Sequence, residues 1–254
     1  MSALPDGTRA ADYACLREVD RAGLMWEWLR RDPDYISWYG KASTATRGAR
    51  QPPSRWSLLF RENPDRIAPK ALIVWRADID PGTLRVIAAP TRSRDPDGLP
   101  LHSLRRWISL VPGMDGREHA VLSDGLHHLR LDVEQGTLAG GPVVLHYLLH
   151  GTRDARPKLR TLRRLTAISL ERRFTPSLFP ADPRQDHWLW ALRVGDALRE
   201  GASQREIAEI LYGPARTRGE WQGHSDSLRS RVRRLVGEAR RLASGDYRKL
   251  MRPE

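Results

Sequence analysis

The sequence of 254 residues is poor in cysteine, in lysine and in long hydrophobic runs. Cys15 is the single cysteine, which excludes an intrachain disulfide and a zinc site made of cysteine thiolates. The apolar stretch 143–149 is far shorter than the roughly 20 residues that a membrane-spanning helix needs. The first residues lack the basic and apolar regions of an export signal. We therefore expect a protein of the reducing cytoplasm.

Short motifs of nucleotide-dependent and hydrolytic enzymes are also missing. The sequence has no G-x-x-x-x-G-K-[ST], G-x-G-x-x-G or G-x-S-x-G motif. His146 and His150 are four residues apart but have no nearby pair of carboxylates, so the histidines predict no metal site. We expect no catalytic residues, no metal and no cofactor, and hence no enzyme. A recombinase or nuclease acting through a residue such as Tyr247 is the least favoured alternative.

Positive charge is abundant and unevenly distributed. The formal net charge is +12, and residues from 151 onward contain 23 Lys and Arg against 13 Asp and Glu. The first 150 residues contain 20 against 18. Arginine supplies all but four of the cations, and its guanidinium suits bidentate contacts with phosphate and guanine. A cationic C-terminal region is typical of a domain that holds a polyanion.

The stretch 225–242 has the pattern of an amphipathic basic helix. At about 100° per residue, six apolar residues share one stripe: Leu228, Val232, Leu235, Val236, Ala239 and Leu242. Three arginines border each flank of that stripe, with Arg229, Arg233 and Arg240 on one side and Arg231, Arg234 and Arg241 on the other. Ser225 is expected as the N-cap, and Asp226 suits the positive end of the helix dipole. Such a helix fits a DNA groove, but it also fits a solvated surface.

A shorter helix is predicted before it, because Ser203-Gln-Arg-Glu206 has the spacing of a capping box. A short helix followed by a basic helix is the order of a helix-turn-helix. We expect base contacts from the first two turns of the basic helix, at Ser227, Arg229, Ser230 and Arg231. Phosphate contacts are expected from seven side chains: Ser203, Gln204, Arg205, Arg216, Arg218, Arg233 and Arg234. The connection 212–224 has 13 residues, where the usual turn has about 3 or 4, so an ordinary helical pair explains the pattern about equally well.

We expect an α+β fold in four segments. Residues 1–45 form a small helical N-terminal module, 46–66 a linker, 67–150 a small antiparallel β region, and 151–254 a basic helical domain. Strands are predicted at 71–75, 83–87, 104–110, 119–122, 126–133 and 142–149, separated by turn sequences. Aromatic residues at helical spacing usually pack inward. The N-terminal module is nevertheless small, so four tryptophans are candidates for partner binding: Trp26, Trp28, Trp38 and Trp221.

Several of these stretches together resemble a known family. Residues 201–213, with Glu220-Trp221 and 226–235, resemble a helix-turn-helix variant in proteobacterial regulators of integrative and conjugative elements. The stretch 240–248 is similar to the end of that domain, and 157–165 resembles the start of the C-terminal unit. Residues 22–35 are similar to the small domain that precedes it in FseA-type activators, whereas the antiactivator QseM carries only the C-terminal domain. The resemblance covers nearly the whole chain. It implies DNA binding without catalytic residues, and it accounts for the long connection.

The favoured function is sequence-specific regulation of transcription, as an activator of genes for excision or conjugative transfer of a mobile element. The partner is then double-stranded promoter DNA in the bacterial nucleoid, with RNA polymerase and an antiactivator protein as further candidates and no membrane. The alternative is a protein-interaction antiactivator or adaptor that binds a related regulator. Because the module 1–45 lacks a cationic excess, we expect its deletion to abolish activation and to leave DNA binding intact.

Overall fold

The computed structural model describes residues 4–44, 53–92, 95–113, 116–221 and 227–251, and it divides into two compact units. Unit 1 joins the two ends of the chain, with Met1–Thr44, Asn63–Ala68 and Ala181–Leu250. Unit 2 contains Ala45–Glu62, Pro69–Pro180 and the last residues, Met251–Glu254. The described strands belong to unit 2 and helices occur in both units, which confirms the expected α+β class.

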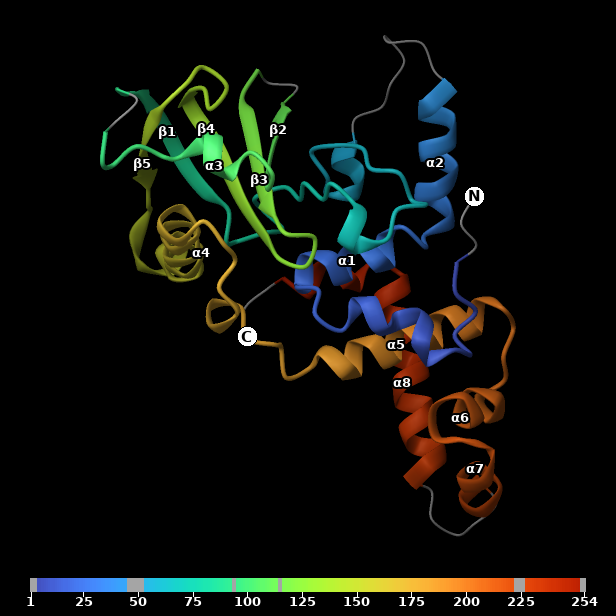
Figure 1. Cartoon of the computed structure of the whole chain (residues 1–254). Helices are drawn as coiled ribbons and strands as arrows, with labels where there is room; N and C mark the ends of the chain where they lie inside the picture. Colours follow the sequence, from blue (N-terminus) through green and yellow to red (C-terminus); the bar gives the residue numbers. More distant parts are fainter. Residues whose placement is uncertain (1–3, 45–52, 93–94, 114–115, 222–226, 252–254) are drawn as a thin grey trace. The chain divides into compact units, whose positions relative to one another are not determined.

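Unit 2 is built on one five-stranded sheet (Figure 1). Its strands lie in the order β2-β3-β4-β1-β5. Their bounds are β1 Leu84–Pro90, β2 Ile108–Pro112, β3 Glu118–Ser123, β4 His128–Gly136 and β5 Val143–Leu148. The alternation of buried and half-buried residues along β1 fits a strand with one face on the core. The short helices η2 (Pro53–Trp56), η3 (Ala68–Lys70), α3 (Leu101–Leu104) and η4 (Pro176–Leu178) lie outside the sheet.

The sheet differs from the sequence-based expectation in two respects. The pairs β2–β3, β3–β4 and β1–β5 are antiparallel as expected, but β1 and β4 pair in parallel. The chain from α3 to β3 lies between them in sequence, and such a crossover connection lets two strands run in the same direction. The predicted strand 71–75 is wrong, because this segment forms only an isolated bridge between Leu58 and Trp75.

Helix α4 (Gly151–Glu171) packs against this sheet in unit 2. Leu165 and Ile168 are buried in the same apolar cluster as the strand residues Leu84, Leu131 and Val133. The buried side of this helix therefore faces the β-sheet. That residues 151–254 form one domain remains a prediction. In the division into compact units, α4 belongs to unit 2 together with the strands.

Unit 1 is entirely helical in its described part. Its elements are η1 (Ala10–Leu16), α1 (Arg21–Leu29), α2 (Pro33–Thr44), α5 (Gln185–Arg199), α6 (Gln204–Tyr212), α7 (Pro214–Trp221), α8 (Ser227–Ala243) and η5 (Asp246–Lys249). Helix α1 contacts α5, α8 and η5 (Figure 1). The side chain of Asp20 caps α1, and α2 begins at Pro33, where a proline costs no helical hydrogen bond. Only residues 30–32 separate the end of α1 from Pro33, the first residue of α2.

The N-terminal module and the C-terminal helices share one core. On α5, Gln185 donates from Nε2 to the carbonyl oxygens of Leu16 at 2.9 Å and Val19 at 3.0 Å. A Cβ on Gly7, which has φ +87°, would lie 2.5 Å from a backbone oxygen of α5, so only glycine fits there. The segment 63–68, taken partly as linker in the sequence, also belongs to this unit. These contacts favour a structural role for residues 1–44, contrary to the expectation that they are dispensable for DNA binding.

Within the described residues, no helix combines the length and the hydropathy that a membrane span requires.

Candidate nucleic-acid interface

The helices α6, α7 and α8 form a contiguous group at one end of unit 1 (Figure 1). The predicted capping box is confirmed: the Ser203 hydroxyl accepts from the Glu206 amide, and the Glu206 carboxylate accepts from the Ser203 amide. Gly213 alone separates α6 from α7, and it adopts φ +85°. The connection 212–224 therefore contains the helix α7, with residues 222–224 outside the described part. The buried Thr217 holds this helix, since its hydroxyl donates to the Gly213 carbonyl at 2.9 Å. The interface consists of three consecutive helices.

Helix α8 buries the predicted apolar stripe. Its six members are all buried: Leu228, Val232, Leu235, Val236, Ala239 and Leu242. Contacts with α5, α6 and α7 cover this face, so the helix is held along its length by the rest of unit 1. Ser225 and Asp226, the expected cap and dipole partner, lie outside the described residues, as does the side chain of Ser227.

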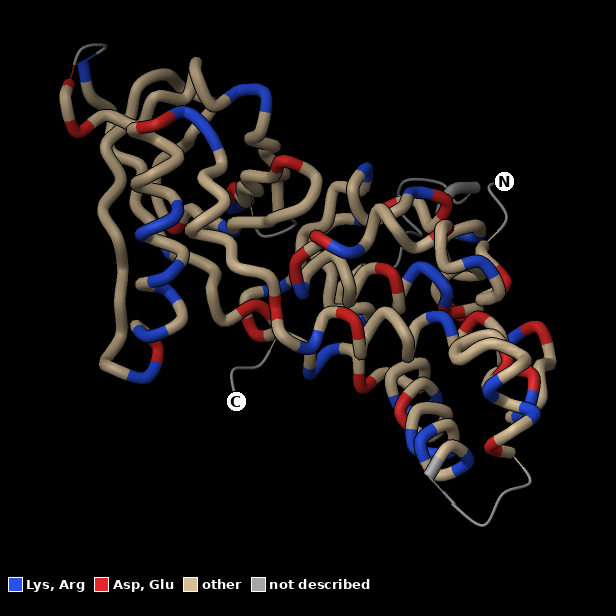
Figure 2. The backbone as a smooth tube through the Cα atoms, turned by 60° about the horizontal axis from the view of Figure 1, so that its bottom comes forward, with Lys and Arg blue, Asp and Glu red and all other residues tan. Residues whose placement is uncertain are grey.

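Most arginines of α8 are exposed. Arg231, Arg233, Arg234, Arg240 and Arg241 are all exposed and, within the described part of the chain, have no carboxylate partner. Figure 2 shows that cationic positions recur along this helix. Of the other expected base contacts, Arg229 and Ser230 are half-buried. The cationic surface of α8 is therefore available to a polyanion, with Arg231 the most accessible described candidate in its first two turns.

The phosphate candidates on α6 and α7 are partly neutralised by neighbouring carboxylates. Hydrogen bonds from the backbone amide and the hydroxyl of Ser203 lower the pKa of Glu206, so a negative charge sits at the start of α6 beside Gln204. Arg205 pairs with Glu209 at 3.4 Å, and Arg216 pairs with Glu220 at 2.8 Å. Arg218 is exposed. On these three helices, most of the described arginines without a carboxylate partner therefore lie on α8.

Three of the four tryptophans expected at a partner surface are buried in unit 1. Trp26, Trp28 and Trp38 have exposed fractions of 0%, 4% and 9%. The indole nitrogen of Trp26 donates to the Arg66 carbonyl at 2.8 Å, and its ring lies edge-on to Tyr35. Trp221 is half-buried at the end of α7. Trp26, Trp28 and Trp38 therefore have no free ring face for a partner, because they form part of the core of unit 1.

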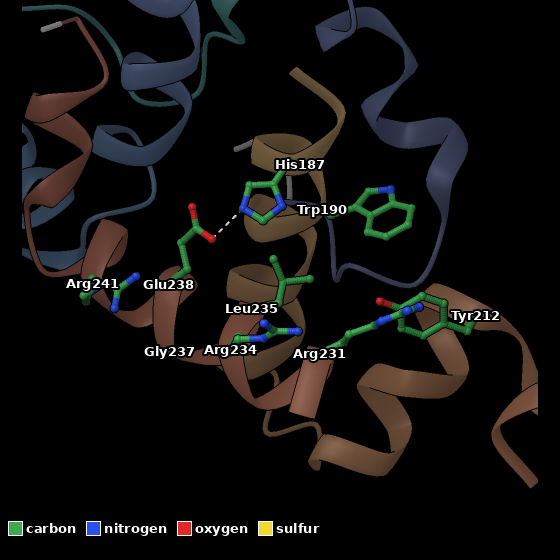
Figure 3. Close-up of a pocket in the computed structure, with 9 residues that line it drawn as sticks. All are labelled: His187, Trp190, Tyr212, Arg231, Arg234, Leu235, Gly237, Glu238 and Arg241. Carbon is green, nitrogen blue, oxygen red and sulfur yellow. Dashed lines mark hydrogen bonds and ion pairs between the residues drawn. The ribbon is translucent and has the colours of Figure 1, made fainter. Parts of the chain in front are cut away.

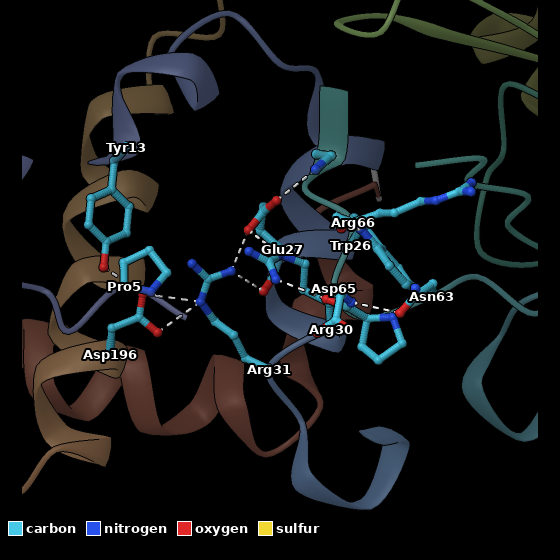
Figure 4. A network of polar contacts seen from close by, with 12 residues as sticks. Pro5, Tyr13, Trp26, Glu27, Arg30, Arg31, Asn63, Asp65, Arg66 and Asp196 are labelled. Carbon is cyan, nitrogen blue, oxygen red and sulfur yellow. Dashed lines mark hydrogen bonds and ion pairs between the residues drawn. The ribbon is translucent and has the colours of Figure 1, made fainter. Parts of the chain in front are cut away.

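A buried ion network was missed by the sequence analysis (Figure 4). Asp196 on α5 accepts from the Tyr13 hydroxyl at 2.6 Å, from Nε of Arg31 at 2.8 Å and from Arg199 at 2.8 Å. Glu27 accepts from Arg31 and from Nε of Arg30 at 2.8 Å. The network therefore joins η1 and α1 to the helix that supports α8.

The pKa values of this network follow from its burial and pairing. Burial alone would raise the pKa of Glu27, but Arg31 and Arg30 outweigh it and hold that pKa below the usual range. Burial and the neighbouring Asp196 carboxylate raise the pKa of the Tyr13 hydroxyl, which stays protonated and donates. In the sequence, the only signal was Glu27 placed three and four residues before Arg30 and Arg31 in an otherwise apolar helix.

Comparison with known families assigns two regions of the chain. Residues 150–252 match the family "T6SS, Transcription factor, DNA binding domain", and residues 6–61 match the "Proteobacterial transcriptional regulator-like domain". No curated protein matches the sequence. The chain thus carries the domains of a DNA-binding transcriptional regulator. These matches do not separate FseA-type activators from other regulators, so that resemblance stays a hypothesis.

Proposed function

We propose that this protein regulates transcription by binding specific promoter sequences through the exposed side of α8. One observation carries the proposal: five exposed arginines without carboxylate partners in the described structure lie on one rigid helix of the matched DNA-binding region. A helix of this kind enters the major groove, where guanidinium groups read guanine and grip phosphate. The protein then acts in the bacterial cytoplasm, on the nucleoid.

The side chains divide by accessibility and position. Arg231 is the leading candidate for base contact, with Ser227, Arg229 and Ser230 in the same two turns. Arg233 and Arg234 take phosphates. Arg218 is exposed and takes a phosphate as well. Ser203, Gln204 and the paired Arg205 and Arg216 contribute less, because nearby carboxylates offset their attraction to phosphate.

We further propose that the protein activates genes for excision or conjugative transfer of a mobile element, with RNA polymerase as its partner at the promoter. The name of the matched DNA-binding family suggests type VI secretion genes as a second group of targets. Mapping the bound sites across the genome separates the two, and a reporter fused to the best site shows whether transcription rises. Repression of that reporter would contradict the activator role.

The other candidates lose support from the structure. The antiactivator or adaptor alternative depended on exposed N-terminal tryptophans, and three of them are buried. A recombinase acting through Tyr247 would need that hydroxyl at the surface. Tyr247 is 1% exposed, and burial raises its pKa to about 12.

Selection of binding sites from random duplexes, followed by titrations of variants, tests the proposal. Arg231→Ala should cost about 1–3 kcal/mol on the selected site and relax the preference at one position. Arg233→Ala should weaken binding to all duplexes, and the slope of log K against log salt should fall by about 0.9. Arg205→Ala removes the same charge from a site that is paired with Glu209, and it should lower the slope by less. Absence of binding to any duplex at low salt, the upstream region of its own gene included, would refute the proposal.

A further inference from the structure

The two arginine flanks of α8 have different surroundings. The flank of Arg231, Arg234 and Arg241 lines an open groove of about 590 Å³ (Figure 3), whereas Arg229, Arg233 and Arg240 do not. Helix α5 contributes His187 and Trp190 to this groove, and Tyr212 comes from the end of α6. Its volume lies within the range of about 300–1,000 Å³ that is typical of small-molecule sites. DNA binding through the tip of α8 does not by itself account for such a hollow.

The charge of the groove favours an anion. None of its three arginines has a carboxylate partner among the described residues. Of the residues that line it, only Glu238 is acidic, and that carboxylate already binds Nε2 of His187 at 2.6 Å. The three arginines on this flank therefore line a space in which the single acidic side chain, Glu238, is already hydrogen-bonded to His187.

The aromatic residues favour a ligand with a flat ring. Trp190 is 39% exposed, although its neighbours Leu189 and Ala191 are buried. Tyr212 meets it edge to face, with ring centroids 5.8 Å apart. An indole left open to solvent beside arginines is the arrangement that stacks a base while cations hold its phosphates. A simple phosphate ion would have no use for the indole.

We propose that this groove binds a nucleotide, with the base against Trp190 and Tyr212 and the phosphates on Arg231, Arg234 and Arg241. The same chemistry is presented by a free nucleotide and by an unpaired nucleotide of a DNA strand. Arg231 and Arg234 are shared with the proposed duplex surface, whereas Trp190 and Arg241 are not, so substitutions at Trp190 and Arg241 test the groove separately from duplex binding.

The test is calorimetric titration of the full chain with adenosine and guanosine triphosphates, with a single-stranded tetranucleotide, and with pyrophosphate. We expect saturable binding of a triphosphate or of the tetranucleotide, and the stronger of the two identifies the source. Trp190→Ala and Arg241→Ala should each weaken it about tenfold, and Trp190→Phe should restore most of the affinity. Arg240→Ala, the same charge change on the opposite flank, is the matched control and should have no effect.

Three results would overturn the inference: no binding of either nucleotide probe, equal binding of pyrophosphate, or unchanged affinity in Trp190→Ala and Arg241→Ala. Thermal unfolding of each variant confirms that it is folded. Duplex binding is measured in parallel. Binding of the duplex but of neither nucleotide probe refutes the groove proposal, whereas binding of a nucleotide but of no duplex refutes the proposed function. Duplex affinity that falls in Trp190→Ala, without nucleotide binding, would assign the groove to DNA.

Discussion

Arginines occur in two contrasting environments within unit 1. Directly after α1, Arg30 and Arg31 are buried and share the carboxylates of Glu27 and Asp196. On α8, Arg231, Arg233, Arg234, Arg240 and Arg241 are exposed and have no carboxylate partner within the described structure. The same type of side chain thus stabilises the core beside α1 and remains available to an external anion on α8. Net charge alone gives no means of telling the two groups apart.

The physical difference is the solvent. A charge taken out of water costs several kcal/mol unless a partner compensates it, so every described charge of the α1 network is tightly paired. An exposed arginine is stabilised by water and needs no partner, so it remains available to phosphate. The contrast implies that changes on α1 alter folding, whereas changes on α8 alter binding.

Deletion of residues 1–44 should have the largest effect. It removes Tyr13 and Arg31, which bind Asp196, and the carbonyl groups that bind Gln185, and it exposes the apolar face of α5. We expect unit 1 to lose its cooperative unfolding transition and DNA binding to disappear with it. Hydrogen exchange of the amides in α5 and α8 measures this directly. Normal protection of those amides in the truncated chain would show that the C-terminal helices fold alone.

Asp196→Ala should cost about 3–5 kcal/mol, because it leaves Arg31 buried without one of its two carboxylates. Urea unfolding followed by tryptophan fluorescence gives the change. Asp186→Ala, an exposed carboxylate at the start of the same helix, is the control and should change stability by less than about 1 kcal/mol. Equal effects of the two substitutions would remove the distinction between the buried and exposed ionic groups.

Acid should weaken unit 1 through Glu27. Its pKa is lower in the folded protein than the ordinary value of 4.5, so its contribution to stability is present above pH 4.5 and is lost as pH falls through the folded pKa. Glu27→Gln lacks this contribution at every pH. The stability difference between the native protein and this variant should therefore shrink steadily below pH 4.5. A difference that stays constant down to pH 2.5 would contradict the ionic role of Glu27.

Arg233→Ala should have the smallest effect on folding, within about 0.5 kcal/mol of the native protein, because the side chain is exposed and unpaired in the described structure. Its loss should appear only in the salt dependence of DNA binding. Destabilisation beyond about 1 kcal/mol in urea unfolding would show that Arg233 stabilises the fold as Arg30 and Arg31 do, and would contradict the distinction between the two groups.

The local elements were predictable where a pattern spans a few turns. The capping box at Ser203, the apolar stripe of α8 and most strands follow from spacing alone. The parallel pairing of β1 with β4 was not predictable, since it depends on a contact between distant segments. Nor was the union of the two chain ends, because the Asp196–Arg31 pair spans 165 positions. Both errors concern which surfaces meet, which periodicity does not encode.

The discontinuous makeup of unit 1 fixes the order of events during synthesis. Its first part, residues 1–44, leaves the ribosome first, and roughly 140 further residues follow before Ala181 emerges. At about 5–20 residues per second this takes roughly 7–30 s. Unit 2 can fold in that interval. The tryptophans of α1 stay exposed until α5 and α8, which contact this helix, have been synthesised. Helix α8, the proposed DNA contact, is thus among the last elements to be placed, and a ribosome that stalls before residue 181 releases a chain in which unit 1 is incomplete.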